Sequence, residues 1–356
     1  MLSLISVAGC SGSTGGSEVE ANGPLICQEE EIADEALFKA AVKEREMTFY
    51  TAHFEEAERK VAEDFTDLTG IDVEVVRLPG TQLNERILSE HGGGQLSADV
   101  VRQSDFVLNL DYLEQGIAVA HTIPEELEAK IPAEWKSPEP GAWYGMPTFM
   151  VPIYNTKEVS AEDAPTSWED LTDPQWSGNI AMTYAGIGGS GWALAMFERQ
   201  VLGEDYWENL AAQKPAILES SSNVTEEIIR GEYPVAINDL YTTTTSIVDG
   251  APVATVFPEE GIPGYSYAMS LFADSPSPNA GELFMNWSNS GCGFASATEH
   301  FNAYSPRPND PLPEDKNGEP LPPLEDLNVW VADAEDWKSL REQWVSEWNE
   351  TFNYGG

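Results

Sequence analysis

Positive charge is scarce in this chain of 356 residues, which carries 18 Lys and Arg side chains against 61 Asp and Glu. The formal net charge of -43 argues against a surface that binds nucleic acid or anionic lipid headgroups. We interpret the acidity as a means of solvation, of the kind that suits a salty habitat, and not as the mark of a ligand site.

Long apolar runs are also missing, because no segment after residue 10 reaches the roughly 18 apolar residues that a membrane-spanning helix needs. The apolar start at 2–9 is too short to span a membrane and has no basic residues before it. It ends in Val7-Ala8-Gly9-Cys10, which resembles a bacterial lipobox, and a Gly/Ser-rich stretch follows. We therefore expect a partial lipoprotein signal at 1–10 whose true start lies upstream, lipid on Cys10 and a flexible linker at 11–24. The protein is then extracytoplasmic and anchored to the cell membrane, on its periplasmic or outer face.

Cysteine is rare, with three in the chain. If Cys10 carries lipid, Cys27 and Cys292 remain as a disulfide or as two buried free thiols. An exported location favours the disulfide, but the residues alone leave both alternatives open.

Sequence motifs of common enzyme classes are absent. The chain has no H-E-x-x-H, no phosphate-binding G-x-x-x-x-G-K-[ST] and no Cys/His cluster with zinc spacing. The run Gly188 to Gly191 resembles a nucleophile elbow, but Trp192 stands where G-x-S-x-G requires glycine. We expect a protein without catalytic residues or cofactor, and a secreted hydrolase is the remote alternative.

Hydrophobic periodicity predicts strands that alternate with helices, in two successive units. In the first unit we expect strands at 47–52, 71–78 and 98–101 and helices at 32–45, 53–68, 82–90 and 105–115. In the second we expect strands at 179–183, 235–238, 253–257 and 265–272, helices at 191–201, 224–230 and 279–287, a Pro-rich excursion at 306–323 and a closing helix at 334–352. This order indicates an α/β fold with a mostly parallel sheet, and two lobes that join near 146–150.

Several segments occur in an order and spacing similar to one known family. They are TFYTAHFEEAERKVAEDF at 48–65, TGIDV at 69–73, ADV at 98–100, IYNT at 153–156, PTSWEDL at 165–171 and PEEG at 258–261. Across about residues 46–310 the chain resembles the ferric-ion-type extracellular solute-binding proteins of bacterial ABC importers.

The resemblance implies the type II periplasmic-binding fold, with two α/β lobes, two crossover strands and a ligand in the cleft. By this analogy lobe one comprises residues 25–147 and 258–300, and lobe two comprises 148–257 and 301–356. Cys27 and Cys292 would then share lobe one, which favours their pairing. The implied partners are a small-molecule ligand and the permease subunits of an ABC importer, and we expect a monomer that binds no nucleic acid.

Candidate ligand residues follow strand ends and precede helices, where open α/β sheets gather their ligands. Small hydroxyls and glycines at helix starts suit an oxyanion, although Ser, Thr and Asn are also ordinary N-cap residues. From lobe one we select Thr51, His53, Thr81, Ser104 and Asp105, and from lobe two Ser190, Gly191, Ser222, Asn223, Asn238 and Tyr241.

The class of ligand is less constrained than the fold. The ferric members of the family use adjacent tyrosines, but here Leu240 precedes Tyr241, and Phe54 and Ser104 fall near the family's histidine and glutamate positions. We therefore expect an oxyanion-bearing solute, a phosphonate or phosphate ester. Two alternatives stay open. One is a ferric ion held by Tyr241 with Tyr184, Tyr265 or an exogenous anion. The other is a polyamine or thiamine held by Asp105 and Asp239 between aromatic walls such as Trp143, Trp192, Tyr241 or Tyr265.

Overall fold

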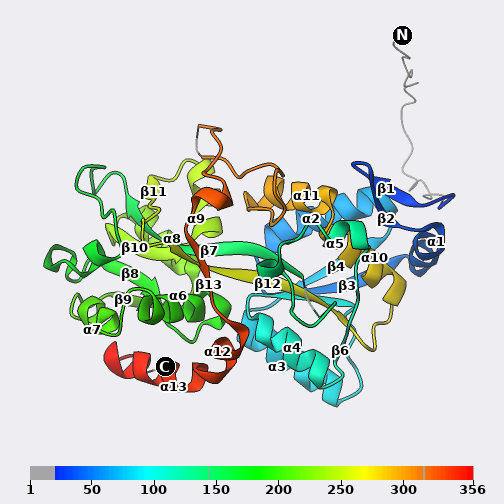
Figure 1. Cartoon of the computed structure of the whole chain (residues 1–356), viewed down its shortest axis with the longest axis horizontal. Coiled ribbons are helices and arrows are strands. Elements are labelled where there is room, and N and C mark those ends of the chain that lie inside the picture. Colours follow the sequence, from blue (N-terminus) through cyan, green and yellow to red (C-terminus); the bar gives the residue numbers. More distant parts are fainter. Residues whose placement is uncertain (1–20, 143, 316, 356) are drawn as a thin grey trace, which may run out of the picture.

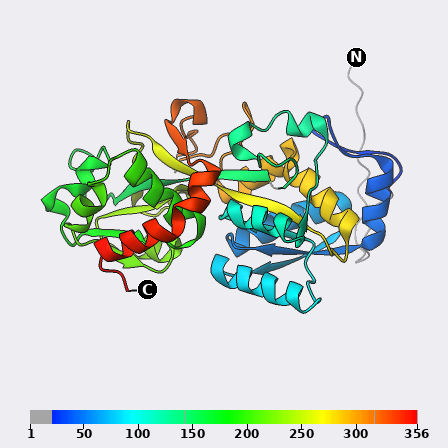
Figure 2. The ribbon, with the colours of Figure 1, turned by 60° about the horizontal axis from the view of Figure 1, so that its bottom comes forward.

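The computed structural model describes residues 21–355 of the chain apart from 143 and 316. The predicted lipobox with Cys10 and most of the predicted linker lie outside these residues. Two lobes lie side by side along the long axis of the molecule, as Figure 1 and the turned view in Figure 2 show. One mixed sheet, ordered β4-β3-β5-β12-β7-β10-β8-β9, runs through both lobes. The expected α/β fold is therefore confirmed.

Lobe one is built on parallel strands β3 (Glu46–Thr51), β4 (Asp72–Arg77) and β5 (Val100–Gln103). The helices between and after them are α2 (Glu55–Thr69), α3 (Gly80–Gly92) and α4 (Phe106–Glu114). Helix α2 buries Val61 and Phe65 at one-turn spacing and ends at Gly70, whose φ of 73° is a left-handed cap. These elements match the sequence prediction to within about two residues at most ends.

Lobe two repeats the pattern with shorter strands. Its strands are β8 (Ile180–Thr183), β9 (Ala216–Leu218), β10 (Val235–Asp239) and β11 (Val253–Thr255). Its helices are α6 (Gly188–Gln200), α7 (Tyr206–Ala211), α8 (Ser221–Arg230) and α9 (Leu240–Val248). Helix α6 is buried over most of its length, because the sheet covers one side and the C-terminal helices the other.

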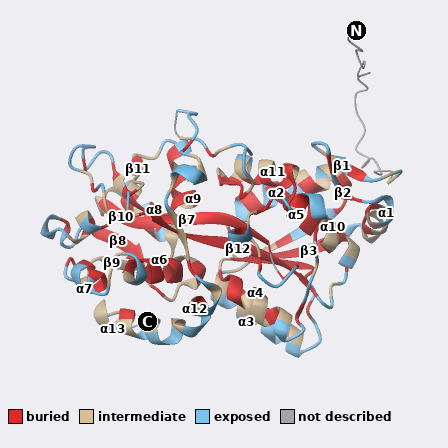
Figure 3. Ribbon diagram, viewed as in Figure 1, coloured by how far each residue is buried: buried red, intermediate tan, exposed pale blue. Residues whose placement is uncertain are grey.

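Two long strands connect the lobes. Strand β7 (Tyr144–Asn155) and strand β12 (Ile262–Phe272) pair antiparallel from Gly264–Phe149 to Met269–Tyr144. Both are buried on both faces, and Figure 3 shows them as a red band through the centre of the molecule. The junction expected near 146–150 falls inside β7, so these strands form the base of the groove between the lobes.

The N-terminal residues fasten onto lobe one. Hairpin β1 (Leu25–Cys27) and β2 (Glu30–Ala33) leads into α1 (Glu35–Glu44), which packs on α10 (Pro278–Ser288). The structure joins Cys27 and Cys292 in a disulfide at the start of α11 (Gly291–Phe301). The helix expected from residue 32 begins later, because residues 30–33 pair as a strand and Asp34 caps the helix by accepting from Leu37 N.

The C-terminal segment crosses from one lobe to the other. Strand β13 (Val329–Val331) pairs in parallel with β12, and α12 (Ala334–Ser339) and α13 (Arg341–Thr351) follow, in red in Figure 1. Helix α12 contacts α4 of lobe one, whereas α13 contacts α6 and α7 of lobe two. The single helix expected at 334–352 is thus wrong in one respect, since the structure divides it at Leu340.

Short elements complete the architecture. They are β6 (Ala118–Val119), α5 (Glu125–Glu128) and the 3-10 turns at Ala133–Trp135, Glu169–Thr172, Pro174–Trp176 and Leu324–Asp326. Among residues 21–355, leaving out 143 and 316, the structure has no helix with the length and apolar character that a membrane crossing requires.

Candidate binding cleft

A cavity of about 340 Å³ lies between the lobes at the carboxyl ends of the lobe-one strands. Residues of both lobes and of the C-terminal segment line it. They are Gly80, Thr81, Asn84, Gln103, Ser104, Asp105, Val107, Leu108, Asp111, Gly186, Gly188, Trp337, Lys338 and Arg341. We call this cavity the open end of the cleft.

Three helices turn their N-terminal ends to the open end. The first turns of α3 and α4 from lobe one line it, together with the first residue of α6 from lobe two. None of the three has a side-chain cap, although α8, α9 and α11 are capped by Ser220, Asp239 and Ser290. Helix ends that lack a side-chain cap leave main-chain N–H groups available to other acceptors, and the helix dipole adds partial positive charge there. At α6 one of these groups, Gly189 N, is already used by Ser104 of the other lobe.

The two lobes meet directly at one wall of this cavity. Gly189 N donates a hydrogen bond of 3.3 Å to Ser104 Oγ. A Cβ atom added at Gly189 would lie 1.8 Å from the Ser104 carbonyl oxygen, so any larger residue would collide with main chain. Glycine at this position is therefore what allows the lobes to approach so closely.

The charged side chains of the open end are matched in pairs. Arg341 forms an ion pair with Asp105, and Trp337 Nε1 donates a 3.0 Å hydrogen bond to the same carboxylate. Lys338 Nζ lies 2.7 Å from Asp111 Oδ1. Because each cation faces a carboxylate, the side chains bring little net charge into the cavity.

One buried acceptor of the open end is unused. Gln103 is 1% exposed and donates its amide hydrogen to Asn109 Oδ1 at 3.2 Å, but its Oε1 accepts no hydrogen bond. Buried polar atoms without a partner are uncommon in folded proteins. A hydroxyl or amine donor in the cavity would satisfy this atom.

The other end of the cleft is filled by aromatic rings. His53 follows β3, and its ring lies 4.7 Å from Tyr241, 3.8 Å from Tyr267 and 4.4 Å from Phe301, measured between centroids. We call these four rings the closed end. They come from the turn after β3, from α9, from β12 and from the end of α11, so both lobes contribute.

Burial controls ionisation at the closed end. His53 is 2% exposed, and burial, followed by the Arg102 and Arg77 charges, holds its pKa well below the usual range, so the ring is neutral at pH 7. Neither ring nitrogen has a hydrogen-bond partner. Burial and neighbouring negative charge also raise the pKa values of Tyr241 and Tyr267.

Two buried carboxylates support the base of the cleft. Asp239 accepts from Tyr265 OH at 2.5 Å and Thr148 Oγ1 at 2.8 Å, which ties lobe two to both crossing strands. Glu58 accepts from Thr51 Oγ1 at 2.9 Å and Arg102 Nη1 at 2.7 Å inside lobe one. Burial raises the pKa of both carboxyl groups, and these hydrogen bonds oppose that shift.

The structure places five of the eleven candidate residues at the two ends of the cleft and six away from the open end. Thr81, Ser104 and Asp105 line the open end, and His53 and Tyr241 form the closed end. The remaining candidates do not line the open end, namely Thr51, Ser190, Gly191, Ser222, Asn223 and Asn238.

Several of that last group have packing roles that explain their residue type. Thr51 bonds Glu58, and Asn238 donates to Thr225 Oγ1 inside lobe two. Gly191 faces the Tyr184 carbonyl, which an added Cβ would meet at 2.2 Å. At α8 Ser220 provides the capping side chain, and the ligand candidates Ser222 and Asn223 lie in the first turn of the helix. The pattern of small polar residues at strand ends cannot separate such roles from ligand contact.

Sequence reasoning missed the residues that come from the C-terminal segment. Trp337, Lys338 and Arg341 line the open end although they lie more than 130 residues beyond Gly188 in the chain. An amphipathic helix near the C-terminus was predicted, but nothing in its pattern indicates which groove it covers. Gln103 was missed because it ends a buried strand and looks like an ordinary strand residue.

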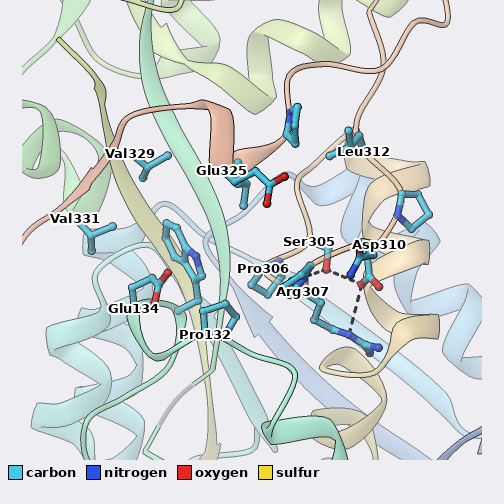
Figure 4. Close-up of a pocket in the computed structure, with 16 residues that line it drawn as sticks. Pro132, Glu134, Ser305, Pro306, Arg307, Asp310, Leu312, Glu325, Val329 and Val331 are labelled. Atoms are coloured by element: carbon cyan, nitrogen blue, oxygen red, sulfur yellow. Dashed lines mark hydrogen bonds and ion pairs between the residues drawn. The ribbon is translucent and has the colours of Figure 1, made fainter. Parts of the chain in front are cut away.

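A larger cavity of about 690 Å³ lies on the opposite side of the crossing strands, with the Pro-rich loop 305–312 along it. Gly264 and Phe149 face Trp135 there, whereas the neighbouring Tyr265 and Thr148 face the cleft. Figure 4 shows the cation of this cavity, Arg307, bound to Asp310, and it also pairs with Glu30. The cation of this cavity is thus already paired, within its own loop and with the N-terminal hairpin.

Comparison with known proteins identifies the family. Residues 51–290, about two thirds of the chain, match the sequence profile described as bacterial extracellular solute-binding protein. The chain belongs to this family. The solute-binding protein also shares its fold with iron-bound HitA from Pseudomonas aeruginosa, at a TM-score of 0.71 and 20% identity over 86% of this chain and 99% of that one. The fructose-6-phosphate-bound AfuA from Actinobacillus pleuropneumoniae gives a TM-score of 0.71 and 19% identity over 87% and 99%. These likenesses establish the type II periplasmic-binding fold.

Part of the chain also resembles a curated protein. Iron uptake protein A1 from Synechocystis is 31% identical over 139 residues, which are 39% of this chain and 37% of that protein. The solute-binding protein therefore matches less than half of the length of the curated relatives. Family membership makes it an extracellular solute-binding protein of the bacterial type. The C-terminal residues at the open end lie outside the matched range.

Proposed function

We propose that this protein captures a small solute carrying an oxyanion group, a phosphonate or phosphate ester, at the open end of its cleft. The observation that carries the proposal is that three helix N-termini without a side-chain cap of their own, from both lobes, line one cavity. Main-chain N–H groups at such ends bind phosphate and other oxyanions without needing a net positive side-chain charge.

The net charge of the chain determines how an anionic solute can be held. With a net charge of -43, the protein repels anions at long range, so an anionic solute must be held by short-range contacts. The paired cations Lys338 and Arg341 are already neutralised, which leaves the helix ends and the hydroxyls of Thr81 and Ser104 as the attractive groups.

The unused acceptor in the cavity narrows the class of solute. Gln103 Oε1 needs a hydrogen-bond donor, and an oxyanion by itself has no donor to offer. A solute with a hydroxyl or amine beside its anionic group, such as a hydroxylated phosphate ester, satisfies both the helix ends and Gln103. A cavity of about 340 Å³ accommodates a solute of that size.

Capture depends on the lobes closing around the solute. Helices α3 and α4 belong to lobe one and α6 to lobe two, so a solute that contacts all three stabilises the closed arrangement over an open one. Docking of this closed form on the permease would follow. If small-angle X-ray scattering showed no compaction of the protein on adding a tightly bound solute, this mechanism would be contradicted.

The test is a binding screen by calorimetry and thermal unfolding. The panel comprises inorganic phosphate, phosphonates, fructose 6-phosphate, ferric citrate, thiamine and spermidine. A solute at 100 times its dissociation constant should stabilise the fold by about 2.7 kcal/mol. Binding of a phosphonate or phosphate ester that Thr81→Val weakens supports the proposal. Glu325→Gln is the control, because Glu325 lines the cavity on the other side of the crossing strands. Binding of thiamine or spermidine alone would contradict it.

Ferric ion is the second candidate, and one observation favours it. The neutral His53 ring is buried without a hydrogen-bond partner and lies against Tyr241 and Tyr267, which would supply a nitrogen and two phenolate oxygens after the rings separate. The part of the chain that the structure describes holds no cluster of three or more His, Cys, Asp or Glu side chains suited to a metal, so the tyrosines would have to supply most of the ligands. HitA and the Synechocystis relative are iron proteins by name.

Iron binding has a spectroscopic signature that separates it from oxyanion binding. Ferric ion on tyrosinate produces a visible charge-transfer band, and Tyr241→Phe would remove or shift that band. Ferric citrate that binds without a visible band, and equally well to Tyr241→Phe, would instead be held through its carboxylates at the open end.

A further inference from the structure

The C-terminal segment binds the side chain of Asp105, the residue that precedes helix α4 at the open end. Asp105 occupies the N-cap position of α4, where an aspartate normally accepts from the N–H groups of its own helix. Here its side chain makes no such bond. Its two oxygens instead accept from Trp337 Nε1 and from the Arg341 guanidinium. We name this pair, Trp337 and Arg341, the C-terminal clasp.

We propose that the C-terminal clasp keeps the anion site open by drawing Asp105 away from the α4 N-terminus. This inference rests on the proposed function of the open end. Without the clasp, the Asp105 carboxylate would turn onto the N–H groups of α4 and occupy the position that a solute oxyanion takes. Arg341 and Trp337 are thus positioning residues, and they determine whether the cavity accepts an anion.

The position of the clasp is itself well fixed. Trp337 is 1% exposed, packs on Phe106 with 4.8 Å between ring centroids, and its carbonyl accepts from Trp192 Nε1 at 3.0 Å. The second terminal nitrogen of Arg341 donates to the Gly188 carbonyl at 3.3 Å. The clasp therefore contacts lobe one and lobe two at once, beside the cavity.

Neutralisation of the Asp105 carboxylate by Arg341 also favours a role for the clasp in anion binding. An unpaired Asp105 carboxylate would repel an oxyanion at the α4 N-terminus, and its burial would strengthen that repulsion. The ion pair with Arg341 removes most of this repulsion. The buried acceptor Gln103 Oε1 in the same cavity is an independent sign that this space receives a polar ligand.

The first test measures binding of fructose 6-phosphate and inorganic phosphate by calorimetry to the full chain and three variants. We expect Arg341→Ala to weaken binding at least tenfold, and Arg341→Ala with Asp105→Ala to return to within about threefold of the wild type, because no carboxylate is left to cap α4. Lys338→Ala removes a positive charge from the same cavity without releasing Asp105, so its loss should be clearly smaller.

Three results would overturn the inference. They are unchanged binding by Arg341→Ala, equal losses in Arg341→Ala and Lys338→Ala, and a double variant that stays as weak as Arg341→Ala, which would mean that Arg341 contacts the solute itself. Wild-type protein that binds neither probe would argue against a phosphate-bearing solute, and hence against the proposed function, without deciding the position of Asp105.

A crystal structure of Arg341→Ala without ligand decides that position directly. Asp105 accepting from a main-chain N–H in the first turn of α4 supports the clasp. If the Asp105 side chain is still directed at Trp337, the inference is overturned, whatever the binding measurements show.

Discussion

At the open end of the cleft the lobes enclose a cavity of about 340 Å³, whereas at the closed end four rings fill the space between the same two lobes. The open end presents main-chain N–H groups and small hydroxyls, and the closed end presents carbon surface with a neutral imidazole. Both ends follow neighbouring strands, β3 and β5, of one sheet. The difference shows that adjacent strand ends of one cleft can serve packing and binding separately.

The largest effect should come from truncating the closed end. Tyr241→Ala removes a ring that is 5% exposed and packs on His53 and Phe301, so it should lower the free energy of unfolding by about 3–4 kcal/mol. Denaturant titration, monitored by tryptophan fluorescence, measures this free energy. Tyr241→Phe keeps the ring and should remain within about 1 kcal/mol of the wild type. A loss below 1 kcal/mol for Tyr241→Ala would show that the closed end is not packed as a core.

Preventing the lobes from meeting should abolish most solute binding without unfolding either lobe. Gly189→Ala places a methyl group 1.8 Å from the Ser104 carbonyl oxygen, a collision relieved when the lobes separate. Solute affinity should fall at least 100-fold, or about 2.7 kcal/mol, with loss of compaction in small-angle scattering. Gly80→Ala is the matched control at the same cavity, since its added Cβ meets nothing within 4 Å. Equal affinities for Gly189→Ala and the wild type would mean that closure at this wall is not needed.

The closed end should also make stability depend on pH. The folded-state pKa of His53 lies well below its unfolded value, so the unfolded chain takes up a proton first as the pH falls. The stabilising contribution is complete above about pH 6.5 and is lost below it, at up to about 1.4 kcal/mol per pH unit. His53→Phe should remove this part of the slope below about pH 6.5. Identical slopes for the two proteins would assign the acid sensitivity to other groups.

Fold and family were predictable from the sequence because they depend on repeated local signals. The alternation of apolar positions in β4, the stripe of α2 and the left-handed Gly70 each specify one element, and their order specifies the architecture. The hairpin before α1 was missed because Ile32 and Ala33 continue the apolar pattern of the helix, and only tertiary pairing with β1 makes them part of a strand.

The site was predictable only in part, because the same residue types cap helices and contact ligands. Ser104 and Thr81 lie at the cavity, whereas Asn238 bonds inside lobe two and Ser222 lies away from the open end. What separates them is whether the two lobes bring another helix end to the same place, which is a long-range property. The C-terminal clasp shows this most clearly, since Arg341 reaches Asp105 across 236 positions of the chain.

The smallest effect distinguishes hydroxyl contacts from main-chain contacts at the open end. Ser104→Ala removes one hydroxyl that accepts from Gly189 N, and leaves the helix ends of α3, α4 and α6 in place. Solute affinity should fall about fivefold, or about 1 kcal/mol, while the free energy of unfolding stays within about 0.5 kcal/mol of the wild type. Calorimetry and denaturant titration give the two numbers. A loss as large as that of Gly189→Ala would place the solute on Ser104 itself, and the main-chain N–H groups would then be secondary. No loss of affinity would leave those N–H groups as the principal contacts. The open end would then differ from the closed end by binding the solute through main-chain groups alone.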